Sequence, residues 1–209
     1  GMCADDRWNS DKKIDWDSVR AVWLKKFQVT NTLVQNIDFI IEKSPPNIVR
    51  LDQLIKVFPK YTLIAFNRDP FANCSSRLFR HYKPAAMGQE ERLKLIKTLA
   101  SKWVFRSRWV RQWMTQMPVI SFTYEDFCAS PEGCLSQLTD KIPQFKTIDV
   151  NKQIKVKDYQ KQVIKNQNEQ QISKLTLEDI DAISEVLITD SELVRFFGYS
   201  PTKEEISVS

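Results

Sequence analysis

Glycine and histidine are scarce in this chain of 209 residues, which has four glycines and one histidine, His81. A loop that wraps a phosphate with backbone N–H groups needs glycine, because other residues keep the backbone too far away. The glycines stand apart, and none is followed by the cation and hydroxyl residues of such a loop; they are Gly1, Gly88, Gly133 and Gly198. We therefore expect no glycine-rich phosphate loop.

Cysteines are also few, and long apolar runs are missing. The four cysteines lack C-x-x-C spacing and accompanying histidines, so we predict no metal site. They are too sparse for a disulfide scaffold, which favours free thiols in a reducing compartment. No apolar run has the length of a membrane span, and the start lacks a signal-peptide core. We expect a soluble, cytoplasmic protein.

Basic residues are in slight excess, 31 against 26 acidic ones, which gives a net charge of +5. This balance suits a phosphorylated ligand or an acidic polymer, and it is equally typical of a solvated surface. A nucleic-acid-binding domain is one alternative, since three arginines lie among the aromatic residues of 103–113. Buried aromatic side chains are the simpler interpretation of that segment.

Apolar strands alternate with helical periodicity along the chain. We predict strands at 37–41, 61–66 and 119–123, separated by amphipathic helices, and a surface loop at 151–171. Strands that alternate with helices indicate an α/β domain with a parallel sheet and flanking helices. The length fits a single domain, 1–209.

The most informative residue is Arg68, which stands where an apolar strand stops and a helix begins. Asp69 is a suitable N-cap for that helix, and Pro70 fits its first position. A guanidinium beside the N-terminus of a helix can hold an anion. From spacing alone, an ion pair with Asp69 or another surface carboxylate is equally compatible.

The helix after Arg68 selects one serine. At 100° per residue, Phe71, Cys74 and Leu78 share one side, which we expect to be buried, whereas Ser76 lies on another side above the small Ala72. Ser75 lies closer to the buried side. Ser76 is therefore the serine with room for a ligand oxygen.

These residues resemble a known family. The strings EKSPPNIVRLDQLIKVFP, YTLIAFNRDPFANCSS and VISFTYEDFCASPEGCL are similar to the sulfotransferases that use PAPS (3′-phosphoadenosine 5′-phosphosulfate), especially their carbohydrate-type bacterial branch. The resemblance implies a P-loop NTPase-like fold and a 3′-phosphate site made by Arg68 and Ser76, eight positions apart. It also implies that Lys43 lies near the transferred sulfate, although an ion pair of Lys43 with Glu42 is an alternative, and that Tyr124-Glu125-Asp126 is mainly structural.

The chain departs from that family in lacking the loop that holds the donor's 5′-phosphosulfate. We therefore expect a domain that is incomplete at its N-terminus, with a vacancy in the sheet. The exposed sheet edge could then pair with a second copy to form a homo-oligomer. The sequence assigns no catalytic base.

Two functions follow from the resemblance. One is a sulfotransferase that, in its complete form, moves the sulfuryl group of PAPS to a hydroxyl or amine of a saccharide-like acceptor. The other is a non-catalytic module that binds PAPS or its product PAP (adenosine 3′,5′-bisphosphate). No metal is expected in either case, and no membrane partner.

Overall fold

A computed structural model describes residues 6–30, 40–153 and 163–203. The chain forms two compact units, Gly1–Tyr61 and Thr62–Ser209, and each is described by itself. The single domain over 1–209 stays a prediction.

The first unit is helical in its described part. Its elements are η1 (Asp6–Trp8), α1 (Trp16–Thr30), η2 (Pro45–Arg50) and α2 (Leu51–Val57). Asp15 caps α1, because its carboxylate accepts a hydrogen bond of 3.0 Å from the backbone N–H of Ser18. The buried Arg50 donates to the backbone carbonyls of Arg7 and Asn9, which ties η1 to η2.

The strand predicted at 37–41 is not found where the chain is described. Residues 37–39 lie outside the described residues, and Ile40 and Ile41 are exposed and belong to no strand.

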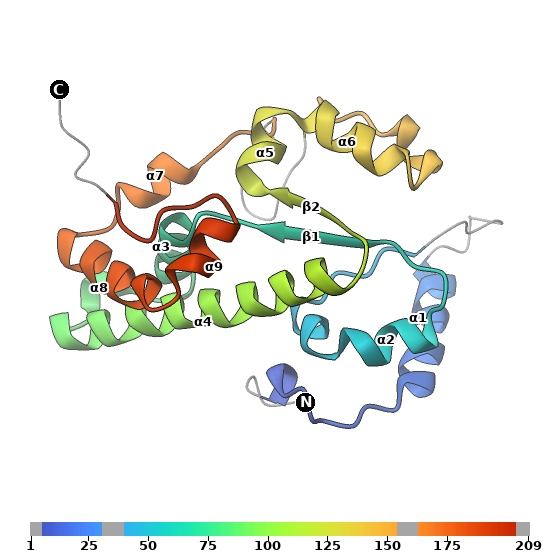
Figure 1. Cartoon of the computed structure of the whole chain (residues 1–209), viewed down its shortest axis with the longest axis horizontal. Helices are drawn as coiled ribbons and strands as arrows, with labels where there is room; N and C mark the ends of the chain where they lie inside the picture. Colours follow the sequence, from blue (N-terminus) through green and yellow to red (C-terminus); the bar gives the residue numbers. More distant parts are fainter. Residues whose placement is uncertain (1–5, 31–39, 154–162, 204–209) are drawn as a thin grey trace. The chain divides into compact units, whose positions relative to one another are not determined.

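The second unit contains the sheet and most helices of the described chain (Figure 1). Its elements are β1 (Leu63–Asn67), α3 (Pro70–His81), η3 (Pro84–Ala86), α4 (Gln89–Gln116), β2 (Val119–Thr123), α5 (Tyr124–Ala129), α6 (Pro131–Thr139), η4 (Pro143–Thr147), α7 (Asn168–Ile172), α8 (Leu177–Ile188) and α9 (Ser191–Phe196).

The two strands are parallel and pair directly, with Leu63 opposite Val119 and Asn67 opposite Thr123. Their connection runs through α3 and α4, as a parallel pair requires. The prediction of an α/β fold with a parallel sheet and flanking helices is confirmed. Because β1 and β2 are hydrogen-bonded neighbours, the expected vacancy does not lie between them.

The two faces of the sheet carry different side chains. Phe66 and Phe122, which are register partners, lie on one face with their ring centroids 5.6 Å apart. Phe127 of α5 packs against Phe66. The other face carries Ala65 and Ser121. The alternation follows from the two-residue period of a strand.

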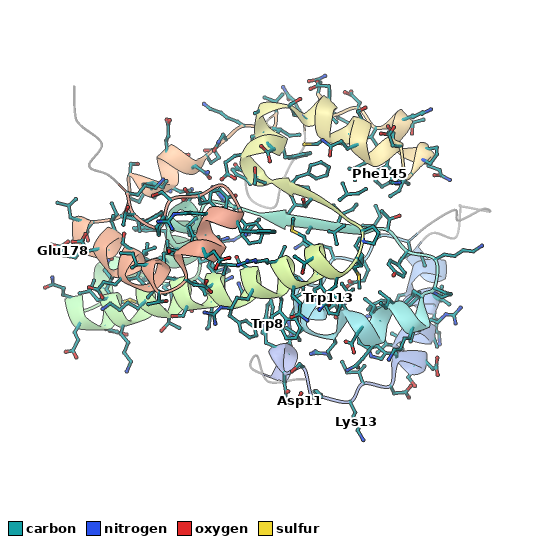
Figure 2. All side chains as sticks on the ribbon, viewed as in Figure 1. Trp8, Asp11, Lys13, Trp113, Phe145 and Glu178 are labelled. Carbon is teal, nitrogen blue, oxygen red and sulfur yellow. The ribbon has the colours of Figure 1, made fainter. Side chains whose placement is uncertain are left out.

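The core of the second unit is a cluster of apolar side chains from helices. It includes the predicted face of α3, since Phe71, Cys74 and Leu78 are fully buried, together with residues of α4, α8 and α9. Phe145 is buried where η4 packs against α6 (Figure 2).

The basic aromatic segment of α4 is largely accounted for by packing. Trp103 and Trp113 are buried, and Arg108 and Arg111 form ion pairs with Asp190 and Glu192. These contacts do not favour the nucleic-acid alternative.

Candidate functional site

The backbone around Arg68 is fixed on both sides. The side chain of Asn67, the last residue of β1, accepts a hydrogen bond of 2.9 Å from the Arg68 N–H, and the indole of Trp103 donates to the Arg68 carbonyl at 2.9 Å. Asp69 is the N-cap of α3, since its carboxylate accepts from the N–H of Ala72. The side chain of Arg68 therefore projects from a backbone turn that hydrogen bonds hold between β1 and α3.

The guanidinium of Arg68 lies against Tyr124, with its Cζ 4.2 Å from the ring centroid. Its Nε donates to Oδ1 of Asn168 at 2.8 Å. Its Nη2 is buried and has no hydrogen-bond partner among the described residues. A buried donor without a partner costs about 1–3 kcal/mol, so this atom has unused capacity for an acceptor.

The ion pair that spacing alone allowed between Arg68 and Asp69 is not formed. Asp69 pairs instead with Lys203, at 3.1 Å between Oδ2 and Nζ. Within the described chain, no carboxylate is paired with Arg68.

The two serines of α3 lie in different surroundings. Ser75 is fully buried and donates to the carbonyl of Gln171 at 2.6 Å. Ser76 is partly exposed, and its hydroxyl makes no hydrogen bond with any described residue. Ala72, on the turn before Ser76, is buried rather than open to solvent. Arg68 and Ser76 thus belong to one unit, at the end of β1 and two turns into α3.

Glu125 connects several segments at the end of β2. Its Oε1 accepts from the N–H of Asp69 at 3.1 Å and from the side-chain amide of Asn168, and its Oε2 accepts from the hydroxyl of Tyr199 at 2.8 Å. Burial raises the pKa of Tyr199, and its hydrogen bond to Glu125 raises it further, so this hydroxyl remains a donor.

Asp126, the next residue, closes a capping box with Thr123 at the start of α5. The contacts of Glu125 and Asp126 agree with a structural role for Tyr124-Glu125-Asp126. Tyr124 has a second contact, because its ring also lies against Arg68.

Sequence reasoning missed Asn168, which it placed in a surface loop. Residues 168–171 instead belong to α7, and Asn168 is buried between Arg68 and Glu125. The segment before it is anchored by Tyr124, whose hydroxyl donates to the carbonyl of Lys165 and accepts from the N–H of Gln167. Burial is the main cause that raises the pKa of Tyr124. The weak periodicity of 151–171 gave no signal for these contacts.

Lys43 belongs to the first unit, where it is exposed. The ion pair with Glu42 is not formed in the described chain, and Glu42 instead accepts from the side-chain amide of Asn47 at 3.0 Å. The catalytic role of Lys43 stays a prediction.

The described residues contain no group of three or more His, Cys, Asp and Glu side chains arranged for a metal ion. In the same part of the chain, none of the helices combines the length and apolar character needed to cross a bilayer.

Comparison with known proteins gives one match. A family model described as "Sulfotransferase family" matches residues 5–143, more than half of the chain. Neither a curated protein nor a solved structure matches the chain.

Proposed function

The chain belongs to the sulfotransferase family, and from that premise we propose that its second unit binds the 3′-phosphate of PAPS for transfer of the sulfuryl group to a saccharide-like acceptor. The acceptor atom is a hydroxyl oxygen or an amine nitrogen. The proposal concerns the 3′ end of the donor, for which Arg68 and Ser76 are our candidate ligands.

The buried Nη2 of Arg68 is the observation that carries this proposal. A phosphate is the natural partner for it, because a guanidinium presents several donors in one plane and keeps its charge at any working pH. The contacts of Arg68 with Asn168 and Tyr124 orient this plane without neutralising it. The side chain of Arg68 and its neighbours therefore suit a bound phosphate.

Each residue has a distinct part in the proposed complex. Arg68 donates to the 3′-phosphate from Nη2, and Ser76 donates its hydroxyl, which has no other described partner. Lys43 is our candidate for stabilising charge on the sulfuryl group. When bound, PAPS would supply that group: the sulfur–oxygen bond to the 5′-phosphate breaks, sulfur bonds to the acceptor oxygen or nitrogen, the acceptor's proton passes to solvent, and PAP leaves.

Titration calorimetry with adenosine 3′,5′-bisphosphate tests the proposal. We expect binding by the unaltered chain and a loss of about 10- to 100-fold in affinity for Arg68→Ala, the range for a hydrogen bond to a charged group. Arg195→Ala is the matched control, because Arg195 is exposed and contacts only Ser191 among described side chains. Equal affinity in Arg68→Ala and the control, or no binding by any of the three, would overturn the proposal.

A non-catalytic module of the same fold is the second candidate. It is favoured by the glycines of this sequence, none of which begins a phosphate-wrapping loop. It predicts binding of PAP without transfer. Incubation with sulfur-labelled PAPS and a panel of saccharides separates the two, because only the enzyme moves label to a saccharide.

We also propose that the protein works in the cytoplasm and self-associates through a strand edge. The cysteines of the described chain are free, which is usual in a reducing compartment. Ile64 and Phe66 of β1 are 39% and 52% exposed, so an outer strand of the small sheet retains apolar surface. Sedimentation that shows a monomer at every concentration would exclude the association.

A further inference from the structure

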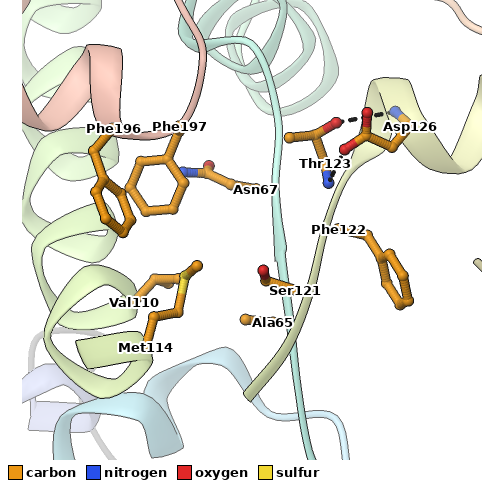
Figure 3. A pocket seen from close by; sticks show the side chains of 10 residues that line it. All are labelled: Ala65, Asn67, Val110, Met114, Ser121, Phe122, Thr123, Asp126, Phe196 and Phe197. Atoms are coloured by element: carbon orange, nitrogen blue, oxygen red, sulfur yellow. Dashed lines mark hydrogen bonds between the residues drawn. The ribbon is translucent and has the colours of Figure 1, made fainter. Parts of the chain in front are cut away.

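A cavity of about 130 Å³ lies beside the ends of the two strands, and residues of both strands, Phe122 among them, line it (Figure 3). Ala65 and Ser121 form its floor, and Phe196 and Phe197 stand at one end. In open α/β sheets, ligands bind at the carboxyl ends of parallel strands. The position of the cavity is therefore that of a ligand site.

The size of the cavity limits what it can hold. A cavity of roughly 150 Å³ in another protein admits one benzene molecule. The space here is therefore suited to one six-membered ring and is too small for two. Any larger ligand must extend beyond it into solvent.

One wall of the cavity is apolar. It is made by Val110 and Met114 of α4 and by Phe196 and Phe197, whose rings are edge to face with centroids 5.0 Å apart. Aromatic and methyl groups of this kind pack against the C–H face of a ring by dispersion and burial of apolar surface. This wall alone does not distinguish a sugar from a phenol.

The other wall is polar and has hydrogen-bonding capacity left. The hydroxyl of Ser121 makes no hydrogen bond with any described residue, although its backbone belongs to the ladder between β1 and β2. The hydroxyl of Thr123 accepts from the N–H of Asp126 and keeps its own proton for donation, and only one oxygen of the Asp126 carboxylate, Oδ2, is bonded, to the Thr123 N–H. Asn67 adds an amide that already donates to Ser107 and has a second N–H.

Several hydroxyl partners spread over one wall suit a polyol better than a phenol, which has one hydroxyl. We propose that this cavity holds one pyranose ring of the saccharide acceptor, with its C–H face on Phe196 and Phe197 and its hydroxyls on Ser121, Thr123 and Asp126. The assignment of the ring as acceptor rests on the proposed function, whereas its binding does not require the donor. Arg68 and this cavity adjoin the same strand ends, since Asn67 and Arg68 are consecutive residues.

Methyl-labelled methionine gives a local readout for the test. The chain has four methionines, and Met114 lines the cavity whereas Met87 lies beyond η3. In NMR spectra recorded without PAP, we expect methyl glycosides of galactose and N-acetylglucosamine to shift the Met114 methyl signal and leave that of Met87 in place. Phenol serves as the competing probe.

Two variants examine the polar wall and the space. Ser121→Ala removes one hydroxyl and should weaken glycoside binding about 2- to 12-fold, the range for one neutral hydrogen bond. Ser136→Ala, at an exposed position of α6, is the matched control. Ala65→Leu fills the cavity and should abolish the Met114 shift. Circular dichroism checks that this variant folds. If Ala65→Leu does not fold, the result with Ser121→Ala tests the proposal.

Each outcome has a defined meaning. A Met114 shift with phenol alone overturns the saccharide assignment, and no shift with any probe overturns the cavity as a binding site. Equal glycoside affinity in Ser121→Ala and Ser136→Ala overturns the role of the polar wall. These results are separate from the PAP titration, so PAP binding without glycoside binding leaves the proposed function standing and removes only this inference.

Discussion

Two arginines of the second unit, Arg92 and Arg68, contact very different partners. Arg92 donates to both oxygens of Asp179, from Nε at 3.0 Å and from Nη2 at 2.5 Å, and Asp179 is fully buried. Arg68 contacts an amide and an aromatic ring, and its Nη2 has no described partner. Arg92 is neutralised by Asp179, whereas the groups that orient Arg68 are neutral and no described carboxylate forms an ion pair with it.

The difference shows how one residue type can serve stability or binding. The hydrogen bond with Asp179 raises the pKa of Arg92, which is the sign of a charge satisfied inside the fold. An arginine that holds a ligand must instead retain its attraction for an anion. The experiments below alter one arginine site at a time.

The largest effect is expected for Arg92→Leu. It leaves the buried carboxylate of Asp179 without its charged partner and with only the N–H of Thr176 as a donor, which costs about 3–5 kcal/mol of unfolding free energy. Urea unfolding measures this loss, and Lys97→Ala is the control, since its ion pair with Glu185 is exposed. A loss below about 1 kcal/mol would contradict a structural role for the pair.

Asn168→Asp should come next, because it places a carboxylate on the Nε of Arg68, and it also replaces the amide donor to Glu125 by a like charge, so its folding is checked by circular dichroism. This change gives Arg68 the kind of partner that Arg92 has, so we expect PAP affinity to fall about 10- to 100-fold. Calorimetry measures the affinity. Asn166→Asp is the control, since it adds the same charge two residues away. If Asn168→Asp binds PAP as tightly as the unaltered chain, the charge of Arg68 does not contribute to PAP binding.

Ser76→Ala should have a smaller effect on PAP binding, about 2- to 12-fold, because one neutral hydrogen bond is lost. Stability should stay within about 0.5 kcal/mol, since Ser76 is partly exposed and has no described partner. Ser75→Ala is the informative counterpart: its buried bond to Gln171 should affect unfolding more than affinity. The reverse pattern would assign the phosphate contact to Ser75.

The smallest effect concerns two thiols. Burial raises the pKa of Cys74 to about 12, and Cys74 is inaccessible in the core. Cys128 is partly exposed; burial raises its pKa, while a hydrogen bond with Tyr124 and the charge of Arg68 act in the opposite direction. At pH 8 we expect iodoacetamide to modify Cys128 before Cys74, and PAP to slow modification of Cys128 a few-fold. Peptide mass spectrometry gives both rates, and faster modification of Cys74 would contradict the buried core.

Local sequence signals were sufficient for the strand-to-helix turn at Arg68. The N-cap at Asp69 and the buried face of α3 depend on neighbours within a few residues, and both are found as predicted. The capping box of Thr176 and Asp179 is equally local, since the two residues are three positions apart. The burial of Asp179 against Arg92 was not predictable, because its partner is 87 positions away in the sequence.

The residues that contact the Arg68 side chain could not be predicted from the sequence. Asn168 lies 100 positions from Arg68, in a segment rich in Lys, Gln and Asn without an apolar period. Such a composition is typical of loops, and only the tertiary contacts with Arg68 and Glu125 explain why it is ordered there. The free Nη2 likewise depends on packing around the side chain, which a sequence pattern does not specify.

The contacts of Glu125 have a practical consequence for the choice of protein fragments. Two of its three partners, Asn168 and Tyr199, come after residue 143, where the family match ends, and so does Lys203, the partner of Asp69. An expression boundary drawn at the end of that match would strip both strand ends of their polar partners. Fragments intended for crystallisation or ligand screening should therefore extend at least through Lys203.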